Sequence, residues 1–154
     1  MRYIIDGYNV TKRDPATRDL DLADQREALV ARLAVRGADL LGAGALIVVF
    51  DGRHGGGSGA RRGPVEVRFS RDEPADDLIA RLIGASGETV VTSDTGLADR
   101  ARARGAKVLG AESCFDVRRA RRRTGRYPAS TAGLPPGANK VTEELKRLWL
   151  TDEE

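Results

Sequence analysis

The sequence predicts an α/β fold with a parallel (mostly) sheet of about five strands and helices on both faces. Two observations support this prediction. Short apolar runs at residues 3–6 and 46–51, the second rich in β-branched side chains, are typical of strands that are covered on both faces. These runs also alternate with stretches of helical periodicity through short connections, which is the pattern of parallel strands joined by right-handed crossovers.

The first half of the chain is predicted to form a β-α-β unit, then a loop and another strand. Between the two apolar runs, leucines are spaced to share one helix face, and Asp19 or Asp21 is the candidate N-cap. Residues 52–63 contain six glycines, so we expect a flexible loop there. Apolar and charged side chains then alternate over residues 65–69, as in an edge strand.

The second half continues the alternation of helices and strands. Pro74 fits the first turn of a helix that we expect to end near Ile83. Residues 89–92 form the next apolar run, and an alanine-rich helix after it should stop near Gly105. Residues 106–109 are predicted to be the last strand.

The length of 154 residues fits one catalytic domain. We expect that domain in residues 1–120. Residues 121–139 begin with arginines and continue into a Gly/Pro-rich stretch, so we interpret them as a basic linker. Residues 140–154 regain helical spacing and are expected to form a C-terminal helix and tail. The sequence leaves the oligomeric state open.

Charge and composition narrow the classes of function. The formal net charge is +3, and 22 of the 26 basic residues are arginine, whose planar fork suits phosphate. An arginine-rich composition can arise without nucleic acid, so charge alone does not decide. The single cysteine excludes an internal disulfide and a cysteine-built zinc site. With no signal peptide and no long apolar run, we expect a cytoplasmic protein without a membrane partner.

Several acidic side chains fall where the predicted strands and one helix meet a single edge of the sheet. Ligands of open parallel sheets collect outside the carboxyl ends of the strands. The polar residues at this edge are Asp6, Asn9, Asp51, Asp76, Asp77 and Asp94. Each aspartate taken alone could instead cap a helix or hold a turn. Because all of these residues are predicted to lie at the same edge of the sheet, we favour a single site that they form together.

A cluster of carboxylates is tolerated when some of them are protonated or when a cation neutralises them. Oxygen ligands of this kind suit Mg²⁺ or Mn²⁺, and such ions assist phosphodiester hydrolysis. Ser93 either orients a water or phosphate, or caps the following helix, and Tyr8 either stacks on a base or packs against the loop. No glycine-rich fingerprint or Walker lysine is present, which argues against dinucleotide and P-loop sites.

Short motifs carry a family resemblance: residues 5–10 (Ile-Asp-Gly-Tyr-Asn-Val), 48–51 (Val-Val-Phe-Asp), 75–77 (Ala-Asp-Asp) with Ile79, and 91–94 (Val-Thr-Ser-Asp), followed by 105–106 (Gly-Ala) and 113–115 (Ser-Cys-Phe). Their order and spacing resemble the NYN branch of the PIN-like nuclease superfamily, and within it the YacP-like proteins. The resemblance extends over residues 2 to about 120.

The resemblance implies a PIN-like sheet, a divalent-metal site that holds Mg²⁺ or Mn²⁺, and endoribonuclease activity. Asp6, Asp76 and Asp94 match the principal acidic positions, as catalytic residues and metal ligands, and Asn9, Asp51 and Ser93 support them. Related domains often carry a further acid just after the serine-aspartate pair, where this chain has Thr95 and Gly96. The number of metal ions therefore stays open.

The predicted function is metal-dependent cleavage of RNA, with ribosome-associated mRNA as one candidate substrate. The candidate RNA contacts are Tyr8, Arg53, Arg61, Arg62, Arg118 and Arg119. One alternative is a non-catalytic module that binds RNA or the ribosome. Another is a metal-using phosphatase or small-nucleotide hydrolase, because the same acidic site suits any phosphate ester.

Overall fold

The computed structural model describes residues 1–52 and 59–124. Its helices and strands, in chain order, are β1 (Arg2–Asp6), α1 (Gly7–Arg13), α2 (Leu22–Leu40), β2 (Ala45–Phe50), β3 (Ala60–Arg62), β4 (Val65–Phe69), α3 (Ala75–Leu82), β5 (Thr89–Val91), α4 (Thr95–Ala103), β6 (Lys107–Leu109), the 3₁₀ helix η1 (Ala111–Cys114) and α5 (Val117–Thr124).

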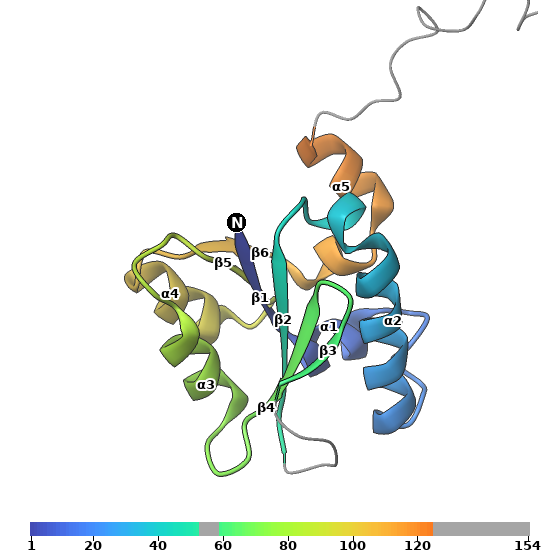
Figure 1. Cartoon of the computed structure of the whole chain (residues 1–154), viewed down its shortest axis with the longest axis horizontal. Coiled ribbons are helices and arrows are strands. Elements are labelled where there is room, and N and C mark those ends of the chain that lie inside the picture. Colours follow the sequence, from blue (N-terminus) through green and yellow to red (C-terminus); the bar gives the residue numbers. More distant parts are fainter. Residues whose placement is uncertain (53–58, 125–154) are drawn as a thin grey trace, which may run out of the picture. The chain divides into compact units, whose positions relative to one another are not determined.

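The strands form one six-stranded sheet in the order β3-β4-β2-β1-β5-β6. Every pairing is parallel except that of β3 with β4. In the centre, Ile4 of β1 lies beside Ile47 of β2 on one side and Val90 of β5 on the other. This register brings the carboxyl ends of three central strands to one edge. The predicted fold class, a mostly parallel sheet with helices on both faces, is confirmed (Figure 1).

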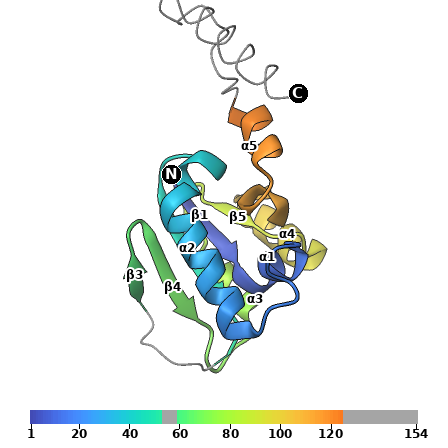
Figure 2. The same ribbon diagram turned by 90° about the vertical axis from the view of Figure 1, so that its right-hand side faces the viewer.

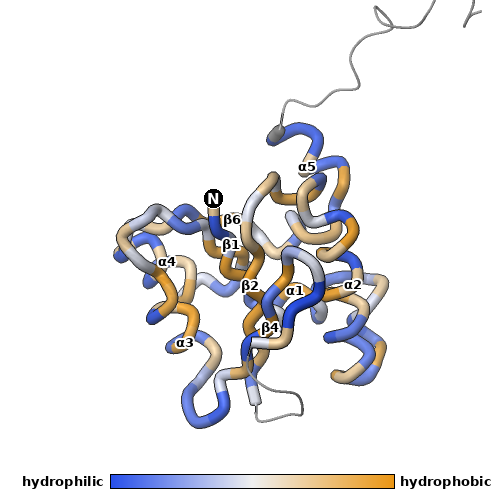
Figure 3. Tube along the Cα trace, viewed as in Figure 1, coloured by the Kyte–Doolittle hydropathy of each residue, from blue (hydrophilic) through white to orange (hydrophobic). Residues whose placement is uncertain are grey.

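Each face of the sheet has its own core. On one face, Val10 of α1, Leu33 of α2 and Cys114 of η1 pack with apolar side chains of the strands. On the other face, Ile79 of α3 and Leu97 of α4 form a second cluster. Figures 1 and 2 show α3 and α4 on one side of the sheet and α1, α2 and α5 on the other. The hydrophobic stretches follow the central strands, whereas α5 is strongly hydrophilic (Figure 3).

Two expectations about the strands are wrong. Residues 60–62, predicted to belong to a flexible loop, form β3, which pairs with β4 in antiparallel fashion. As a consequence β4 lies between β3 and β2 rather than at the edge, and β3 brings the number of strands to six. All three residues of β3 are exposed, so the strand is held by backbone pairing and surface ion pairs such as Arg61–Glu66, and its sequence has no apolar pattern that predicts a strand.

Three helical elements were not predicted, namely α1, η1 and α5. Helix α1 starts directly after β1, and α5 continues to Thr124, so the first residues assigned to the linker are helical. The rest of the linker and the helix and tail expected over residues 140–154 lie outside the described residues, and this domain division stays a prediction. At the start of α2, the Asp21 carboxylate accepts a hydrogen bond from the Asp24 amide (2.8 Å), which selects Asp21 as the N-cap. No helix in the described part is long and apolar enough to cross a membrane.

Candidate active site

The site begins at the junction of β1 and α1. Strand β1 ends at Asp6, whose exposed fraction is only 9%, and α1 begins at the next residue, Gly7. A Cβ atom on Gly7 would lie 2.3 Å from a ring carbon of Phe50, closer than any real contact. Glycine is therefore required for the chain to turn from strand to helix against Phe50, and this turn sets the position of Asp6.

Polar side chains connect the ends of β1 and β5. The Thr92 hydroxyl donates to Asp6 Oδ2 (3.2 Å) and accepts from the backbone N–H of Asp94 (3.1 Å). From α1, Asn9 Oδ1 accepts a hydrogen bond from the Ser93 amide (2.8 Å). Two of these bonds join residues that are more than 80 positions apart in the sequence. Together the bonds hold four predicted site residues in place relative to one another: Asp6, Asn9, Ser93 and Asp94.

An open pocket of about 350 Å³ lies at this edge of the sheet. The predicted site residues that line it are Asp6, Tyr8, Asn9, Asp51 and Asp76. Lys12, Pro74 and Ala75 complete the lining. Asp94 and Ser93 are not part of it. The structure thus brings five predicted residues from β1, α1, α3 and the end of β2 to one cavity.

The charges of three aspartates influence one another. Burial, the largest cause, raises the pKa of Asp6 to about 6; a hydrogen bond from Thr92 opposes this rise, and the negative charges of Asp76 and Asp94 add to it. Burial also raises the pKa of Asp76, and the charge of Asp94 strengthens the effect, while Arg100 opposes it. Negative charge at this site is therefore only partly compensated by protein groups.

Other predicted residues make structural contacts. Asp94 Oδ1 accepts from the Leu97 amide (2.8 Å), so Asp94 is also the N-cap of α4. The Ser93 hydroxyl accepts from the Ala111 amide (2.9 Å), which connects it to η1 rather than to the α4 N-terminus. Asp77, one residue from Asp76, pairs with Arg100 (2.7 Å). This ion pair separates the role of Asp77 from that of its neighbour.

Five of the six residues predicted to contact RNA are described by the structure, and they lie in three places. Tyr8 lines the acidic pocket. Arg61 and Arg62 are exposed on β3 and line a second pocket beside α2. Arg118 and Arg119 are exposed on α5, where Arg119 lies 3.5 Å from Glu112. Arg53 lies outside the described residues.

Sequence reasoning missed several polar residues around the site. Ser70 donates to Asp51 Oδ1 (2.9 Å), Thr92 donates to Asp6, and the Lys12 ammonium lies 5.8 Å from the centre of the Tyr8 ring. Lys12 could have been found, since it follows Tyr8 by one helical turn and so shares its face of the helix. For Ser70 and Thr92, neither the residue type nor the spacing in the sequence predicts a contact with a carboxylate of the site.

The donors at this site are carboxylate oxygens, which suit hard cations such as Mg²⁺ and Mn²⁺. In the described residues, no three acidic, histidine or cysteine side chains lie close enough together to enclose an ion. Mg²⁺ commonly binds through one or two carboxylates and completes its shell with water and substrate phosphate. The uncompensated charge at Asp6 and Asp76 fits that mode, and the assignment of ligands stays a prediction.

Comparisons with known proteins agree with this geometry. The family of YacP-like NYN domains matches residues 3–131. The crystal structure of Rae1 (YacP) from Bacillus subtilis is 27% identical, with a TM-score of 0.62, and the match covers 97% of this chain and 92% of that chain. A point mutant of Rae1 is 26% identical, with a TM-score of 0.61, and the match covers 97% of this chain and 89% of that one. No curated protein gives a significant match.

Proposed function

The chain belongs to the YacP-like NYN domain family, a family of nucleases, and from this premise we propose that it is an endoribonuclease that requires Mg²⁺ or Mn²⁺. The reaction is hydrolysis of RNA phosphodiester bonds at the acidic pocket. Ribosome-associated mRNA is a candidate substrate within this proposal.

One observation carries the proposal. Asp6 and Asp76 line an open pocket with Asp51; burial raises the pKa of both, and the charge of the neighbouring Asp94 adds to the rise. Because like charges at short range disfavour ionisation, these carboxylates gain most from a bound cation. A structural cluster would instead pair its acids with arginine, as Asp77 does with Arg100.

We assign Asp6 and Asp76, which line the pocket, to hold the metal directly, and Asp94, the third predicted ligand, to act on it through bound water. When bound, a divalent cation supplies positive charge that stabilises the phosphodiester transition state and lowers the pKa of water. Thr92 and Asn9 keep the ends of β1 and β5 together, so they hold Asp6 and Asp94 in place. The Ser70 hydroxyl holds Asp51 Oδ1, and we assign Asp51 Oδ2 to orient the attacking water and accept its proton.

The remaining groups of the pocket bind substrate in this proposal. The Lys12 ammonium is the one cation among the residues that line the pocket, and it provides an attraction for phosphate. Tyr8 presents a partly exposed ring beside it, suited to stacking on a base.

The test compares neighbouring aspartates. A labelled structured RNA and a matched DNA are incubated with wild type, Asp76→Asn or Asp77→Asn in Mn²⁺, Mg²⁺ or EDTA. We expect wild type and Asp77→Asn to make internal cuts in the RNA only with metal, and Asp76→Asn to lose at least 100-fold in rate, about the loss seen when one electrostatic stabiliser is removed. Full metal-dependent cleavage by Asp76→Asn would refute the assignment, and turnover of mononucleotides alone would identify a nucleotide hydrolase.

A second candidate, a non-catalytic module that binds RNA or the ribosome, is favoured by α5. Arg118, Arg121 and Arg122 are exposed there and make no ion pair with the described residues. This alternative predicts tight, salt-sensitive RNA binding that EDTA does not change, together with no cleavage of free or ribosome-bound mRNA.

A further inference from the structure

A second pocket of about 350 Å³ lies on the α2 side of the sheet. Val67 and Phe69 of β4, both partly exposed, line it together with the buried ring of Phe50. Helix α2 contributes Arg26, and β3 contributes Arg61 and Arg62. We call this pocket the aromatic groove. Its lining is more apolar than that of the acidic pocket, and it is edged by three arginines.

Tyr8 connects the aromatic groove to the acidic pocket. Tyr8 lines the acidic pocket, its ring centre lies 5.1 Å from that of Phe50 in the groove, and its hydroxyl accepts from Arg26 Nη1 (2.8 Å). In addition, Phe50 and Asp51 are consecutive residues that line the groove and the acidic pocket respectively. One layer of side chains therefore separates the two cavities.

The aromatic groove and the acidic pocket have opposite charge. Asp6, Asp51 and Asp76 line the acidic pocket, whereas three arginines and one acid, Glu27, line the groove. Glu27 pairs with Arg62, and Arg61 lies 3.2 Å from Glu66. Arg26 makes no ion pair with the described residues and bonds only to Tyr8. The groove thus keeps net positive charge beside a flat apolar surface.

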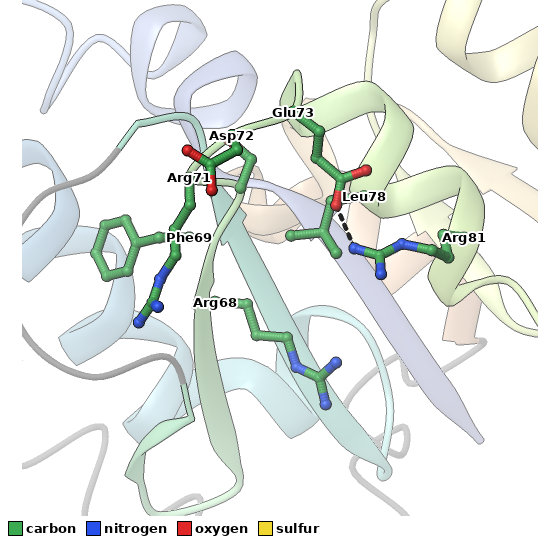
Figure 4. Close-up of a pocket in the computed structure, with 8 residues that line it drawn as sticks. Arg68, Phe69, Arg71, Asp72, Glu73, Leu78 and Arg81 are labelled. Carbon is green, nitrogen blue, oxygen red and sulfur yellow. Dashed lines mark hydrogen bonds and ion pairs between the residues drawn. The ribbon is translucent and has the colours of Figure 1, made fainter.

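The pocket on the opposite face of β4 differs in character. It is lined by Arg68, Arg71 and Arg81 with two acids, and Arg81 pairs with Glu73 (Figure 4). Figure 4 shows Phe69 on the other side of β4 from Arg68 and Arg81. Because side chains alternate along a strand, the Phe69 ring points to the groove side of β4, although Phe69 lines both pockets.

We propose that the aromatic groove binds one unpaired base of the RNA substrate, a short distance along the strand from the bond that is cut. Every base has a flat face that stacks on an aromatic ring, and arginines bind the phosphates beside it. A base stacked on Phe69 fixes the register of the strand in the acidic pocket. The groove therefore selects unpaired RNA and sets the distance between the bound base and the cut. This inference rests on the proposed function.

The test is a binding profile with abasic RNA. A single-stranded oligonucleotide and a series with one abasic residue at each position are titrated onto the Asp94→Asn protein with Mg²⁺, which keeps the RNA intact. We expect the affinity to fall at least about fivefold for an abasic residue at one position, since stacking on an aromatic ring contributes about 1–3 kcal/mol per base. In the Phe69→Leu background, the same abasic residue should change the affinity less than about twofold.

Two further variants serve as controls. Arg81→Ala, on the opposite face of β4, should leave the profile and the affinity unchanged. Arg62→Ala removes an exposed side chain and should reduce the slope of log K against log salt by about 0.7 without moving the sensitive position. This variant tests the groove even if Phe69→Leu lowers the melting temperature.

A flat abasic profile, no RNA binding, or a folded Phe69→Leu protein with an unchanged profile would overturn the inference. The two proposals fail separately. RNA cleavage by wild type together with a flat abasic profile would support the proposed nuclease activity and contradict the proposed base-binding role of the groove. A profile with one sensitive position but no cleavage would support base binding in the groove and contradict the proposed nuclease activity.

Discussion

At the scale of single residues, Asp6 places a destabilising charge in the fold. The pKa of Asp6 is raised to about 6 from an ordinary value of 3.8, so the folded state holds the proton more tightly than the unfolded chain. Such a group stabilises the fold below its unfolded pKa, and that contribution is lost as the pH rises through the folded value. Above pH 6, ionised Asp6 costs the metal-free protein up to about 3 kcal/mol.

Replacing Asp6 with asparagine should therefore stabilise the metal-free protein in a pH-dependent way. In EDTA at pH 8, we expect Asp6→Asn to raise the free energy of unfolding by about 1–3 kcal/mol, and at pH 4 to change it little. Urea unfolding at both pH values measures this difference. Asp77→Asn, which loses an exposed ion pair, should change stability by less than about 1 kcal/mol. A gain that is equal at both pH values would contradict the assigned cause.

Thr92 connects the two strand ends through hydrogen bonds that valine cannot make. Because Asp6 and the Asp94 amide both bond its hydroxyl, Thr92→Val should lower the free energy of unfolding by about 1–3 kcal/mol and reduce the cleavage rate. Thr89→Val is the matched control, since Thr89 is equally buried in β5 and its hydroxyl makes no hydrogen bond in the described structure. Equal effects of the two changes in denaturant unfolding would show that the network contributes nothing.

These residues show what sequence reasoning finds and what it misses. Asp6, Asp51 and Asp76 could be predicted to converge because strand ends and a helix start meet at one edge of a parallel sheet. Thr92 and Ser70 could not, because a hydroxyl in a strand or turn looks the same whether or not it bonds to a carboxylate. Their role depends on which strands become neighbours in the sheet, and the local pattern of apolar residues does not predict that strand order.

At the scale of elements, predictability follows from which interaction forms the element. Strands β1, β2 and β5 are buried on both faces, so an uninterrupted apolar run in the sequence predicts each of them. Strand β3 exists through backbone bonds to β4, and α5 buries Ala120 beneath a surface of arginines. Neither element carries enough apolar residues to produce a periodic signal.

The junction of β1 and α1 gives a prediction at this scale. Gly7→Ala should destabilise the fold by about 1–3 kcal/mol, because the new Cβ would lie 2.3 Å from the Phe50 ring and force the strand and helix apart. Gly96→Ala in the first turn of α4 is the matched control. Its Cβ would lie 3.4 Å from Asp94, an ordinary contact, so the better helix propensity of alanine should stabilise by up to about 1 kcal/mol. Thermal melts of both variants in EDTA would check the opposite signs.

At the scale of the whole molecule, Cys114 reports on the opening of the fold. The thiol is fully buried in the core between the sheet and helices α1, α2 and α5, and burial raises its pKa to about 12. A thiol reagent needs both access and a thiolate. Because Cys114 is the single cysteine of the chain, its labelling rate measures one opening event.

We expect labelling of the native protein to be slower than that of the unfolded chain by the folding equilibrium constant, and to depend on urea as steeply as global unfolding does. If Mg²⁺ binds the acidic pocket, labelling in wild type should slow about 100-fold when the ion is present at 100 times its dissociation constant, since binding to the folded state shifts the whole equilibrium. The Asp6→Asn protein should show no such slowing. A shallow urea dependence would instead mean that η1 and α5 open on their own, and Cys114 would then report on that end of the domain while the strands that carry the acidic pocket stay folded.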